Sequence, residues 1–549
     1  MKKHFNIADL FELVAGAVPE REALVCGDKR LTFNELDERS NRFAHYLQQQ
    51  GVGAGDHVGL YLYNCNEYIE AMFACFKLRA VPININYRYV GAELSYIFDN
   101  AQLKAVVHHR EFVPVIEGVV ETKHPIFERL KTFVAVNDAF DHSLDGLNNA
   151  GLTAIEHESS IESMSPEHDF GERSGDDLFI LYTGGTTGMP KGVMWPHEAV
   201  FFAAMNGAGH FHPDGPLKTP EEIVRCKDTD ALRGISLAPL MHGASWWYSC
   251  IQLLGGNTLV LDSNHKMDSE QIWRTIAAEK VNMIQIVGDA MAIPLLEGLA
   301  NVKDELDLSN LFSVGSGGAV FSESKQRAFK ENFPNCFVTN NFGSSESGQM
   351  GTDNGSKKTA SGLGNFPRSE VMDVLVEQED GSYRHAEKGE TGIVSRSGYI
   401  PVGYYNDPEK TAKTFIPVDG KTWLLSGDAA LLEEDDTITI FGRGSNCINS
   451  GGEKIFPEEV EQALKENPAV CDALVVATPH ERWGSQVSAV VSLNEGQSLT
   501  LESLQDHARK LISSYKLPRL LCVADEIQRS ASGKPDYKWA LDLALKEIG

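Results

Sequence analysis

The sequence is poor in positive charge. It has 49 Lys and Arg residues against 77 Asp and Glu, which gives a formal net charge of −28. Nucleic acids and anionic membranes bind clustered Lys and Arg, so we expect no nucleic-acid partner. A small anionic substrate stays compatible with this charge, because a few local cations and backbone N–H groups are enough to bind it.

Long apolar runs and paired cysteines are also missing. No run approaches the roughly 18 residues of a membrane-spanning helix, and charged residues interrupt the amino-terminal stretch MKKHFNIADLFELVAGAVPE. The nine cysteines never form a Cys-x-x-Cys pair, which argues against a zinc ribbon or a thioredoxin-type site. The sequence therefore predicts no integral membrane segment, no signal peptide and a reducing compartment, the cytoplasm.

Helical periods alternate with short apolar runs between Leu31 and Val394, among them HVGLYLY, KAVVHH, TFVAV, DLFILY, NTLVL and NMIQIV. This alternation is typical of an α/β protein with mainly parallel sheets flanked by helices. After the hairpin-like segment 423–443, a smaller α+β part follows, with a helix start at Pro457 and strands ALVVA and SAVVS. We predict a large N-terminal domain, residues 1–443, and a C-terminal domain, residues 444–549, joined by a hinge.

The stretch LYTGGTTGMPKGV, residues 181–193, holds four glycines, three threonines and one lysine between two expected strands. Glycines let the backbone approach an anion closely, and successive N–H groups can surround a phosphate. The stretch does not match the Walker pattern G-x-x-x-x-G-K-[ST]. On composition alone it could equally be a polar turn.

This stretch resembles the phosphate loop of the adenylate-forming superfamily, which includes acyl-CoA synthetases, peptide-synthetase adenylation domains and luciferases. Further motifs of the superfamily follow in the same order: SVGSGGA (313–319), NNFGSSE (340–346), SGD (426–428), GR (442–443) and RSASGK (529–534). Members commonly have Ser where this chain has Gly184, so one hydroxyl is missing. The resemblance covers nearly the whole chain and implies an acyl-CoA synthetase-like fold.

The resemblance implies a site for ATP and Mg²⁺. Glu346 would hold Mg²⁺, which favours carboxylate oxygen, Phe342 would stack on adenine, and Ser345 would touch the α-phosphate. Asp428 would bind the ribose hydroxyls with help from Arg443. Lys534 would bring carboxylate and α-phosphate together and offset transition-state charge. The implied catalytic residues are Lys534, Thr186 and Glu346; the other implied nucleotide contacts are Thr183, Gly184, Gly185, Thr187, Lys191, Gly317, Gly318, Ala319, Asn341 and Gly343.

The resemblance also implies a second step in which a thiol takes the acyl group. Gly451, Gly452 and Trp483 would line a passage for the pantetheine arm of coenzyme A, and Ser445 stands at the hinge position where relatives have Asp or Lys. No carrier-protein segment follows Gly549, so we expect free CoA as the acceptor.

A small carboxylic acid is the expected third substrate. The segment MHGASWW has His242 where peptide-synthetase domains usually carry an Asp that binds an amino group. The implied acyl-pocket residues are His242, Met205, Gly207, Trp246, Trp247 and Gly317. The combination of MHGASWW, IVGDAMAIPLL and GSGGAVFS is similar to bacterial acyl-CoA synthetases that activate fatty acids or steroid side-chain acids. We therefore expect a medium-chain, long-chain or bulky apolar acid.

Two other functions stay open at this point: an adenylating enzyme that passes the acyl group to a carrier protein or another acceptor, and a catalytically silent nucleotide-binding relative. Taken singly, the residues above also have structural explanations, such as a solvated carboxylate or a packed core histidine. The sequence does not determine the oligomeric state, and a homodimer is compatible with it.

Overall fold

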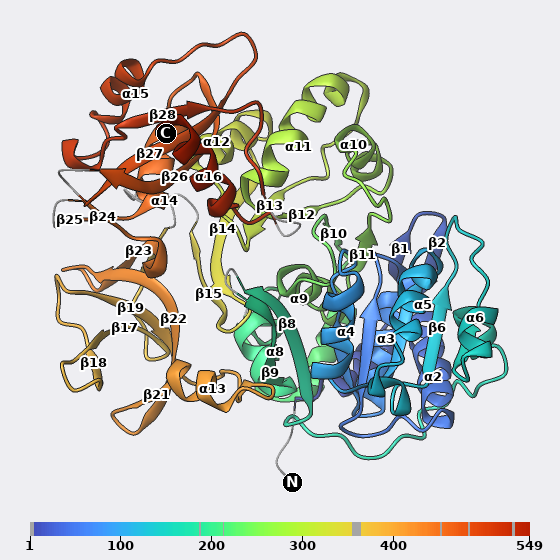
Figure 1. Ribbon diagram of the computed structural model, residues 1–549. Helices are drawn as coiled ribbons and strands as arrows, with labels where there is room; N and C mark the ends of the chain where they lie inside the picture. Colours follow the sequence, from blue (N-terminus) through green and yellow to red (C-terminus); the bar gives the residue numbers. More distant parts are fainter. Residues whose placement is uncertain are drawn as a thin grey trace. The chain divides into compact units, whose positions relative to one another are not determined.

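The computed structural model describes residues 5–185, 188–211, 214–353, 364–450, 453–480, 484–529 and 533–548 (Figure 1). The chain divides into two compact units. The first unit comprises Met1–Asp268, Thr275–Ile284 and Tyr399–Lys413; the second comprises Ser269–Arg274, Gln285–Gly398 and Thr414–Gly549. Within the described residues, no helix is long and apolar enough to cross a membrane.

The main sheet of the first unit has eight strands in the order β20-β9-β8-β4-β3-β5-β6-β7. Strands β8 to β7 of this order are parallel, whereas β9 pairs antiparallel with both β8 and β20. The strands are β3 His57–Tyr61, β4 Val81–Asn84, β5 Leu103–His109, β6 Thr132–Val136, β7 Thr153–Glu156, β8 Leu178–Gly185, β9 Gly188–Pro196 and β20 Gly403–Tyr404. The inner parallel strands β3, β4, β5 and β6 are buried almost throughout, as expected for strands covered on both faces, whereas the edge strand β7 is partly exposed.

A second group of strands in this unit pairs in the order β10-β11-β1-β2. It is parallel except for the β1–β2 hairpin. These strands are β1 Glu22–Cys26, β2 Lys29–Thr32, β10 Arg233–Ser236 and β11 Thr258–Leu261.

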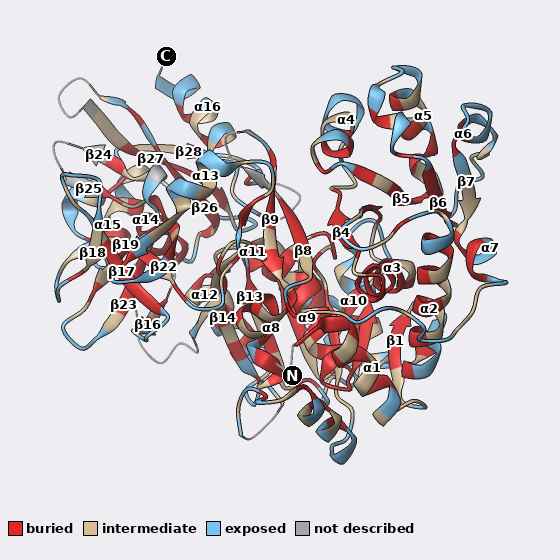
Figure 2. Cartoon of the chain, turned by 90° about the horizontal axis from the view of Figure 1, so that it is seen from below, coloured by how far each residue is buried: buried red, intermediate tan, exposed pale blue. Residues whose placement is uncertain are grey.

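Helices flank the strands of the first unit: α2 and α5 bury one side, whereas α3 is buried nearly all round. Helix α2 begins with a capping box, in which Thr32 accepts from the Glu35 N–H and the Glu35 carboxylate accepts from the Thr32 N–H. Figure 2 shows exposed residues on α4 and α5 and buried residues on β5 and β6. The helices are α1 Ile7–Ala17, α2 Phe33–Gln49, α3 Asn66–Lys77, α4 Gly91–Asn100, α5 Val113–Glu121, α6 Asp145–Asn149, α7 His157–Ile161, α8 His197–Met205 and α9 Gly243–Leu254.

Three elements lie at the limits of the units: α10 Ser269–Ala278, β12 Met283–Ile286 and α13 Pro408–Thr414.

The second unit contains a parallel pair, β13 and β14, with β15 antiparallel to β14, and a separate antiparallel sheet. The antiparallel sheet has the order β16-β23-β22-β19-β17-β18, and β21 also pairs with β22. The strands are β13 Ser313–Gly317, β14 Phe337–Ser344, β15 Gly348–Asp353, β16 Asn365–Pro367, β17 Met372–Glu377, β18 Tyr383–His385, β19 Thr391–Arg396, β21 Phe415–Val418, β22 Lys421–Leu432 and β23 Thr437–Arg443. Helices α11 Gly288–Val302 and α12 Glu323–Asn332 belong to the same unit.

The last hundred residues add a three-stranded sheet in the order β26-β27-β28, with helices on both faces. On one face Val475 and Ala489 pack with the α14 and α15 side chains, and on the other Leu474 and Val490 pack with those of α16. Alternate residues of one strand thus enter two cores, as the two-residue period of a strand requires. The elements are β24 Ile448–Ser450, β25 Glu453–Ile455, α14 Pro457–Lys465, β26 Val470–His480, β27 Gly484–Leu493, α15 Leu501–Ala508, β28 Leu520–Val523 and α16 Tyr537–Ile548.

The predicted α/β class is confirmed: a large part with parallel-rich sheets flanked by helices, followed by a small α+β part. The expected strands HVGLYLY, KAVVHH, TFVAV, DLFILY, NTLVL and NMIQIV correspond to β3, β5, β6, β8, β11 and β12. The domain boundary near Arg443 stays a prediction. One detail differs from expectation: β8 and β9 extend to Gly185 and from Gly188, so the glycine-rich stretch is mostly strand.

Candidate active site

Asp428 and Arg443 face each other across the β22–β23 hairpin, where their Cα atoms are register partners. Arg443 Nε lies 3.2 Å from Asp428 Oδ1, and Arg443 Nη1 donates to the Ser426 carbonyl at 2.8 Å. Burial raises the pKa of Asp428, and the Arg443 cation acts against that increase. Asp428 is thus a buried carboxylate in an ion pair with Arg443, at the position where the sequence predicts a ribose-binding Asp.

Two glycines shape this hairpin. Gly442 has φ +113°, and a Cβ there would lie 2.4 Å from the Glu458 carboxyl carbon. Gly427 has φ +81°, so its backbone also lies in the region that favours glycine. The Arg443 N–H donates to Glu458 Oε1 at 3.3 Å, and burial raises the pKa of Glu458 to about 8. This helix α14 carboxyl therefore packs directly on the strand that carries Arg443.

Glu346 lies in the short turn between β14 and β15. Ser344 and Ser347 close this turn reciprocally: each backbone N–H donates to the hydroxyl of the other, at 3.0 and 3.1 Å. Ser345 and Glu346 lie between these two fixed residues and are half-buried. The local sequence thus holds a carboxylate and a hydroxyl on a tied turn.

Lys534 joins this group from the far end of the chain. The residue is exposed, yet the protein atoms around its side chain remove enough water to lower the pKa of Lys534 from its usual value near 10.5. The Arg443 cation lowers this pKa further, whereas Glu346 and Asp428 raise it. These influences indicate that the four charged groups are neighbours, so the second unit brings together residues from four separate predicted motifs.

Strands β13 and β14 carry or border four of the predicted nucleotide contacts: Gly317, Gly318, Ala319 and Asn341. Gly317 and Asn341 are register partners, and a Cβ on Gly317 would lie 3.5 Å from the Asn341 Cβ. Gly318 is exposed with φ +91°, and Ala319 follows it half-buried. Gly317 itself is buried, and the predicted contact of residues 317–319 with the nucleotide stays a prediction.

Phe342 and Gly343 are constrained by their neighbours on these strands. The Phe342 ring packs against Phe366 at 5.6 Å between centroids and stays half-buried. A Cβ on Gly343 would lie 2.0 Å from the Gly348 carbonyl oxygen, so the β14–β15 pairing requires glycine there. Stacking of adenine on Phe342 stays a prediction.

The glycine-rich stretch lies in the first unit, on β8 and β9. Thr183 and Lys191 are register partners, and the register shifts between Thr183 and Gly185, at Gly184. Lys191 Nζ lies 3.2 Å from Asp407 Oδ2, with 40% of the Lys191 side chain exposed. An incoming anion would therefore compete with the half-buried Asp407 carboxylate for this cation.

Asn84 connects this stretch to the predicted acyl segment. The Tyr182 N–H donates to Asn84 Oδ1 at 2.7 Å, and Asn84 Nδ2 donates to the carbonyls of Tyr182 at 2.8 Å and Met241 at 2.7 Å. A Cβ on Gly243, next to His242, would lie 2.8 Å from Leu181 Cδ2. Strand β8 and the segment that precedes α9 therefore pack directly against each other.

The predicted acyl-pocket residues of the first unit differ in their surroundings. Trp246 is 2% exposed and stacks on Phe179 at 4.3 Å, and Met205 is 1% exposed, so both lie in the core. Trp247 is 8% exposed, and its indole N–H has no hydrogen-bond acceptor within the described part of the chain. Gly207 is buried at φ +52° against Phe202. Their contact with an acyl chain stays a prediction.

Several predicted residues lie outside the described residues: Thr186, Thr187, Gly451, Gly452 and Trp483. The backbone of Ser445 is described and forms the short helix Gly444–Asn446 directly after β23.

The sequence does not predict a buried group of four charges in the second unit: Asp289, Lys465, Asp472 and Arg529. Asp289 and Arg529 occur in the motifs IVGDAMAIPLL and RSASGK, whereas Lys465 and Asp472 belong to no motif. Charged residues bordering apolar segments were the only available signal, and no spacing rule links them.

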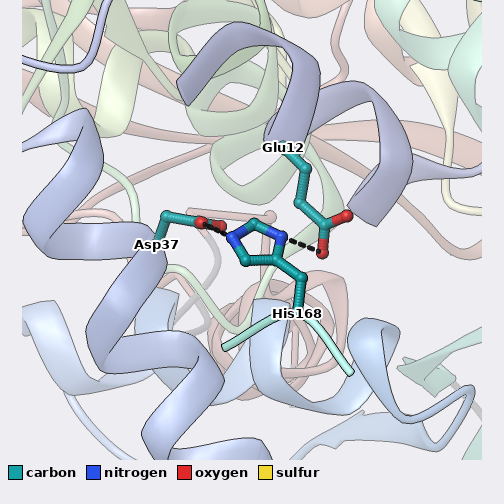
Figure 3. A group of neighbouring side chains, drawn as sticks. All are labelled: Glu12, Asp37 and His168. Atoms are coloured by element: carbon teal, nitrogen blue, oxygen red, sulfur yellow. Dashed lines mark ion pairs between the residues drawn. The ribbon is translucent and has the colours of Figure 1, made fainter. Parts of the chain in front are cut away.

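An acidic cluster in the first unit has the wrong surroundings for a metal site. Glu12, Asp37 and His168 converge (Figure 3), but the fully buried Lys77 ammonium lies 2.7 Å from both Glu12 Oε1 and Asp37 Oδ1. Burial opposes the Glu12 charge, yet Lys77 and Arg173 outweigh it and lower the pKa of Glu12 to about 2. Protein cations already neutralise these carboxylates, so we interpret the cluster as a tie between α1, α2 and α3.

A nucleotide-binding α/β enzyme is the class that this fold and these residues define. The chain belongs to the AMP-binding enzyme family: residues 11–405 match that family, and residues 459–534 match the AMP-binding enzyme C-terminal domain. The predicted membership of the adenylate-forming superfamily is thereby confirmed.

Individual relatives agree with the predicted branch. Over 543 residues the chain is 43% identical to the 3-oxocholest-4-en-26-oate–CoA ligase of Rhodococcus rhodochrous, covering 98% of this chain and 95% of that protein. It is also 43% identical to the medium/long-chain-fatty-acid–CoA/3-oxocholest-4-en-26-oate–CoA ligase of Mycobacterium marinum, covering 97% and 96%. The crystal structure of the anthranilate CoA ligase AuaEII in complex with anthranoyl-AMP shares the fold, with a TM-score of 0.83 at 21% identity, covering 100% of this chain and 99% of that one.

Proposed function

We propose that this protein is an ATP-dependent carboxylic acid–CoA ligase that forms AMP. A carboxylate oxygen attacks the α-phosphorus of ATP, the bond to the pyrophosphate oxygen breaks, and acyl-AMP and pyrophosphate result. The CoA thiol then loses its proton and attacks the acyl carbon, AMP leaves, and acyl-CoA forms. The observation that carries this proposal is the gathering of Glu346, Asp428, Arg443 and Lys534 in one unit.

In this proposal the residues act by position and charge, because phosphoryl-group substitution asks little covalent chemistry of the protein. Asp428 and Arg443 hold the ribose hydroxyls, and the Lys534 ammonium lies between the two reacting anions. Thr183, Lys191 and the glycines of the stretch 181–193 bind phosphate. Two acids, Glu346 and Asp428, and one base, Arg443, surround Lys534. This setting favours the proposed role, since the Lys534 cation can offset charge that develops in the transition state.

Mg²⁺ fits the donor chemistry of this group. Glu346 offers carboxylate oxygens on a tied turn, and Mg²⁺ is usually held by one or two carboxylates together with substrate phosphates. When bound, the ion would neutralise phosphate charge. We assign Glu346 as its protein ligand.

For the acid we propose a medium-chain, long-chain or bulky apolar, steroid-type molecule. Support comes from the names of the two 43% identical relatives and from the buried apolar residues Met241, Trp246 and Trp247 in the segment that contains His242. An apolar wall with few polar groups suits such a ligand.

We further place the enzyme in the cytoplasm, supported by a sequence in which none of the nine cysteines forms a Cys-x-x-Cys pair, as fits a reducing compartment. The two-domain division at 443/444, with Ser445 as hinge, is also part of the proposal.

The test is AMP release by the full chain with ATP, Mg²⁺ and CoA across a panel of carboxylates: acetate, octanoate, palmitate, benzoate and a steroid side-chain acid. We expect CoA-dependent turnover that is greatest for the apolar acids. Adenylate formation without CoA-dependent release would favour another acceptor, and no ATP consumption with any acid would favour a silent relative. Turnover confined to acetate or benzoate would overturn the substrate proposal alone.

A further inference from the structure

Four charged side chains form a buried charge network in the second unit: Asp289, Lys465, Asp472 and Arg529. Lys465 Nζ lies 3.1 Å from Asp289 Oδ2 and 3.1 Å from Asp472 Oδ1. Arg529 binds Asp472 with both Nε and Nη2, the shortest distance being 2.7 Å. The side chains are between 0 and 10% exposed, so nearly all of their charge is satisfied inside the protein.

The network holds its charges by mutual compensation. Burial opposes the Lys465 cation, yet Asp472 and Asp289 outweigh it and raise the pKa of Lys465. Burial likewise opposes the Asp472 charge, but Lys465 and Arg529 lower the pKa of Asp472. The two acids and two bases of the network sum to zero, and removing one of them leaves an uncompensated buried charge. The buried Glu461 carboxyl also interacts with Lys465 and Arg529, and burial raises its pKa to about 7.

Asp289 anchors this network to helix α11. It occupies the first turn of α11, where the helix dipole favours an acid, and accepts hydrogen bonds from the Ser322 N–H at 2.9 Å and hydroxyl at 3.0 Å. Its second oxygen is left for Lys465, the last residue of α14. A single carboxylate therefore ties the start of α11 to the end of α14.

The other end of the network reaches the residue before Lys534. Arg529 Nη1 donates to the Gly533 carbonyl at 3.2 Å. A Cβ on Gly533 would lie 3.3 Å from both Val287 Cγ1 and Ala290 Cβ, at the start of α11. Helix α11 is therefore connected to Gly533 in two ways: by direct packing at its start, and through the four charged side chains.

We propose that Asp289 is a positioning residue for adenylate formation: through the buried charge network it fixes Gly533, and with it the Lys534 ammonium group. The proposal rests on the function proposed above, because it concerns the ATP-dependent half of that reaction. Asp289 touches no reacting atom in this proposal; it determines where the cation beside Glu346 lies.

The experiment compares the two half-reactions of the full chain in single and paired variants. Asp289→Asn keeps the shape but leaves the network with a net charge of +1, and Lys465→Met leaves it at −1. The double variant Asp289→Asn/Lys465→Met restores neutrality without restoring the tie between α11 and α14. We expect its unfolding temperature to recover relative to the single variants, because neighbouring charge substitutions are not additive.

Adenylate formation is measured by pyrophosphate–ATP exchange. In the double variant it should remain about 10²-fold slower than in the wild type, because small misplacements of a catalytic group have effects of this size. The loss should appear in kcat with KM for ATP unchanged, and thioester formation from supplied acyl-adenylate and CoA should be preserved. Competitive acetylation of Lys534 across pH, read by mass spectrometry, should report a higher pKa in the variant as the ammonium gains water.

Arg327→Met is the matched control. It removes an ion pair of 3.1 Å to Glu466, which also joins α12 to the C-cap of α14, but half of the Arg327 side chain is exposed. Exposed pairs contribute about 0–1 kcal/mol, so all measured quantities should stay at wild-type values.

A double variant with wild-type exchange kinetics, or one that loses both half-reactions equally, would overturn the proposal. Wild-type protein without any CoA-dependent AMP release would instead contradict the proposed function. The acetylation profile of Lys534 still decides whether Asp289 controls the position of that lysine in that case.

Discussion

Replacing Lys534 with alanine tests the centre of the proposed site. Glu346 and Asp428 contribute two negative charges and Arg443 and Lys534 two positive ones, so the group is neutral in the wild type. Alanine leaves a net charge of −1 where a carboxylate and a triphosphate have to meet. Removing one preorganised charge or donor from a transition-state site slows reactions about 10²–10³-fold, and we expect this loss in adenylate formation.

The pH dependence gives the same residue a second signature. Because the pKa of Lys534 is lowered, its cation is lost at a lower pH than for an ordinary lysine, and kcat/KM for adenylate formation should fall as the pH rises through that value. Lys534→Arg should keep part of the rate and lose this alkaline decrease, since guanidinium stays charged throughout.

The assay is pyrophosphate–ATP exchange from pH 6 to 10, paired with thioester formation from supplied acyl-adenylate. Lys538→Ala, on the exposed side of α16, is the matched control and should behave as wild type. Equal loss of both half-reactions in Lys534→Ala, or an unchanged alkaline limb in Lys534→Arg, would refute the role given to this lysine.

Three further predictions address the metal, the buried carboxyl and the loop strand. Glu346→Gln should raise the Mg²⁺ concentration needed for half-maximal exchange, and an unchanged Mg²⁺ titration would exclude Glu346 as a ligand. Because burial raises the pKa of Glu458 to about 8, the folded state keeps a proton that the unfolded chain loses near pH 4.5. The free energy of unfolding should therefore fall as the pH rises between these two values. Glu458→Gln should flatten this fall in urea unfolding, and a slope identical to that of the wild type would contradict the argument. Gly192→Ala would place a Cβ 2.7 Å from Ile180 Cγ2 and should destabilise the protein by about 1–3 kcal/mol in thermal unfolding. The control Gly16→Ala, whose Cβ would have no atom within 4 Å, should leave the stability unchanged. Equal melting temperatures for the two variants would contradict the packing argument.

Local patterns were sufficient for most of the fold. Short apolar runs bounded by polar segments mark buried strands, so the strands β3, β5, β6, β8 and β11 could be predicted from the sequence. The glycine-rich stretch was read less well. Its glycines indicated a loop, but Gly192 is there because the Ile180 and Tyr182 side chains fill the space of a Cβ across the β8–β9 pair.

For the site, the sequence by itself determined which functional side chains are present, because the motifs specify their identity and their order along the chain. Glu346, Asp428, Arg443 and Lys534 were all named from those motifs. Tertiary structure alone decided that these four lie together, since the electrostatic contact between Glu346 and Lys534 joins residues 188 positions apart. It also decided what surrounds them: the buried tie from Asp289 to Lys465 depends on two helix ends meeting away from water, and no pattern along the chain encodes that meeting.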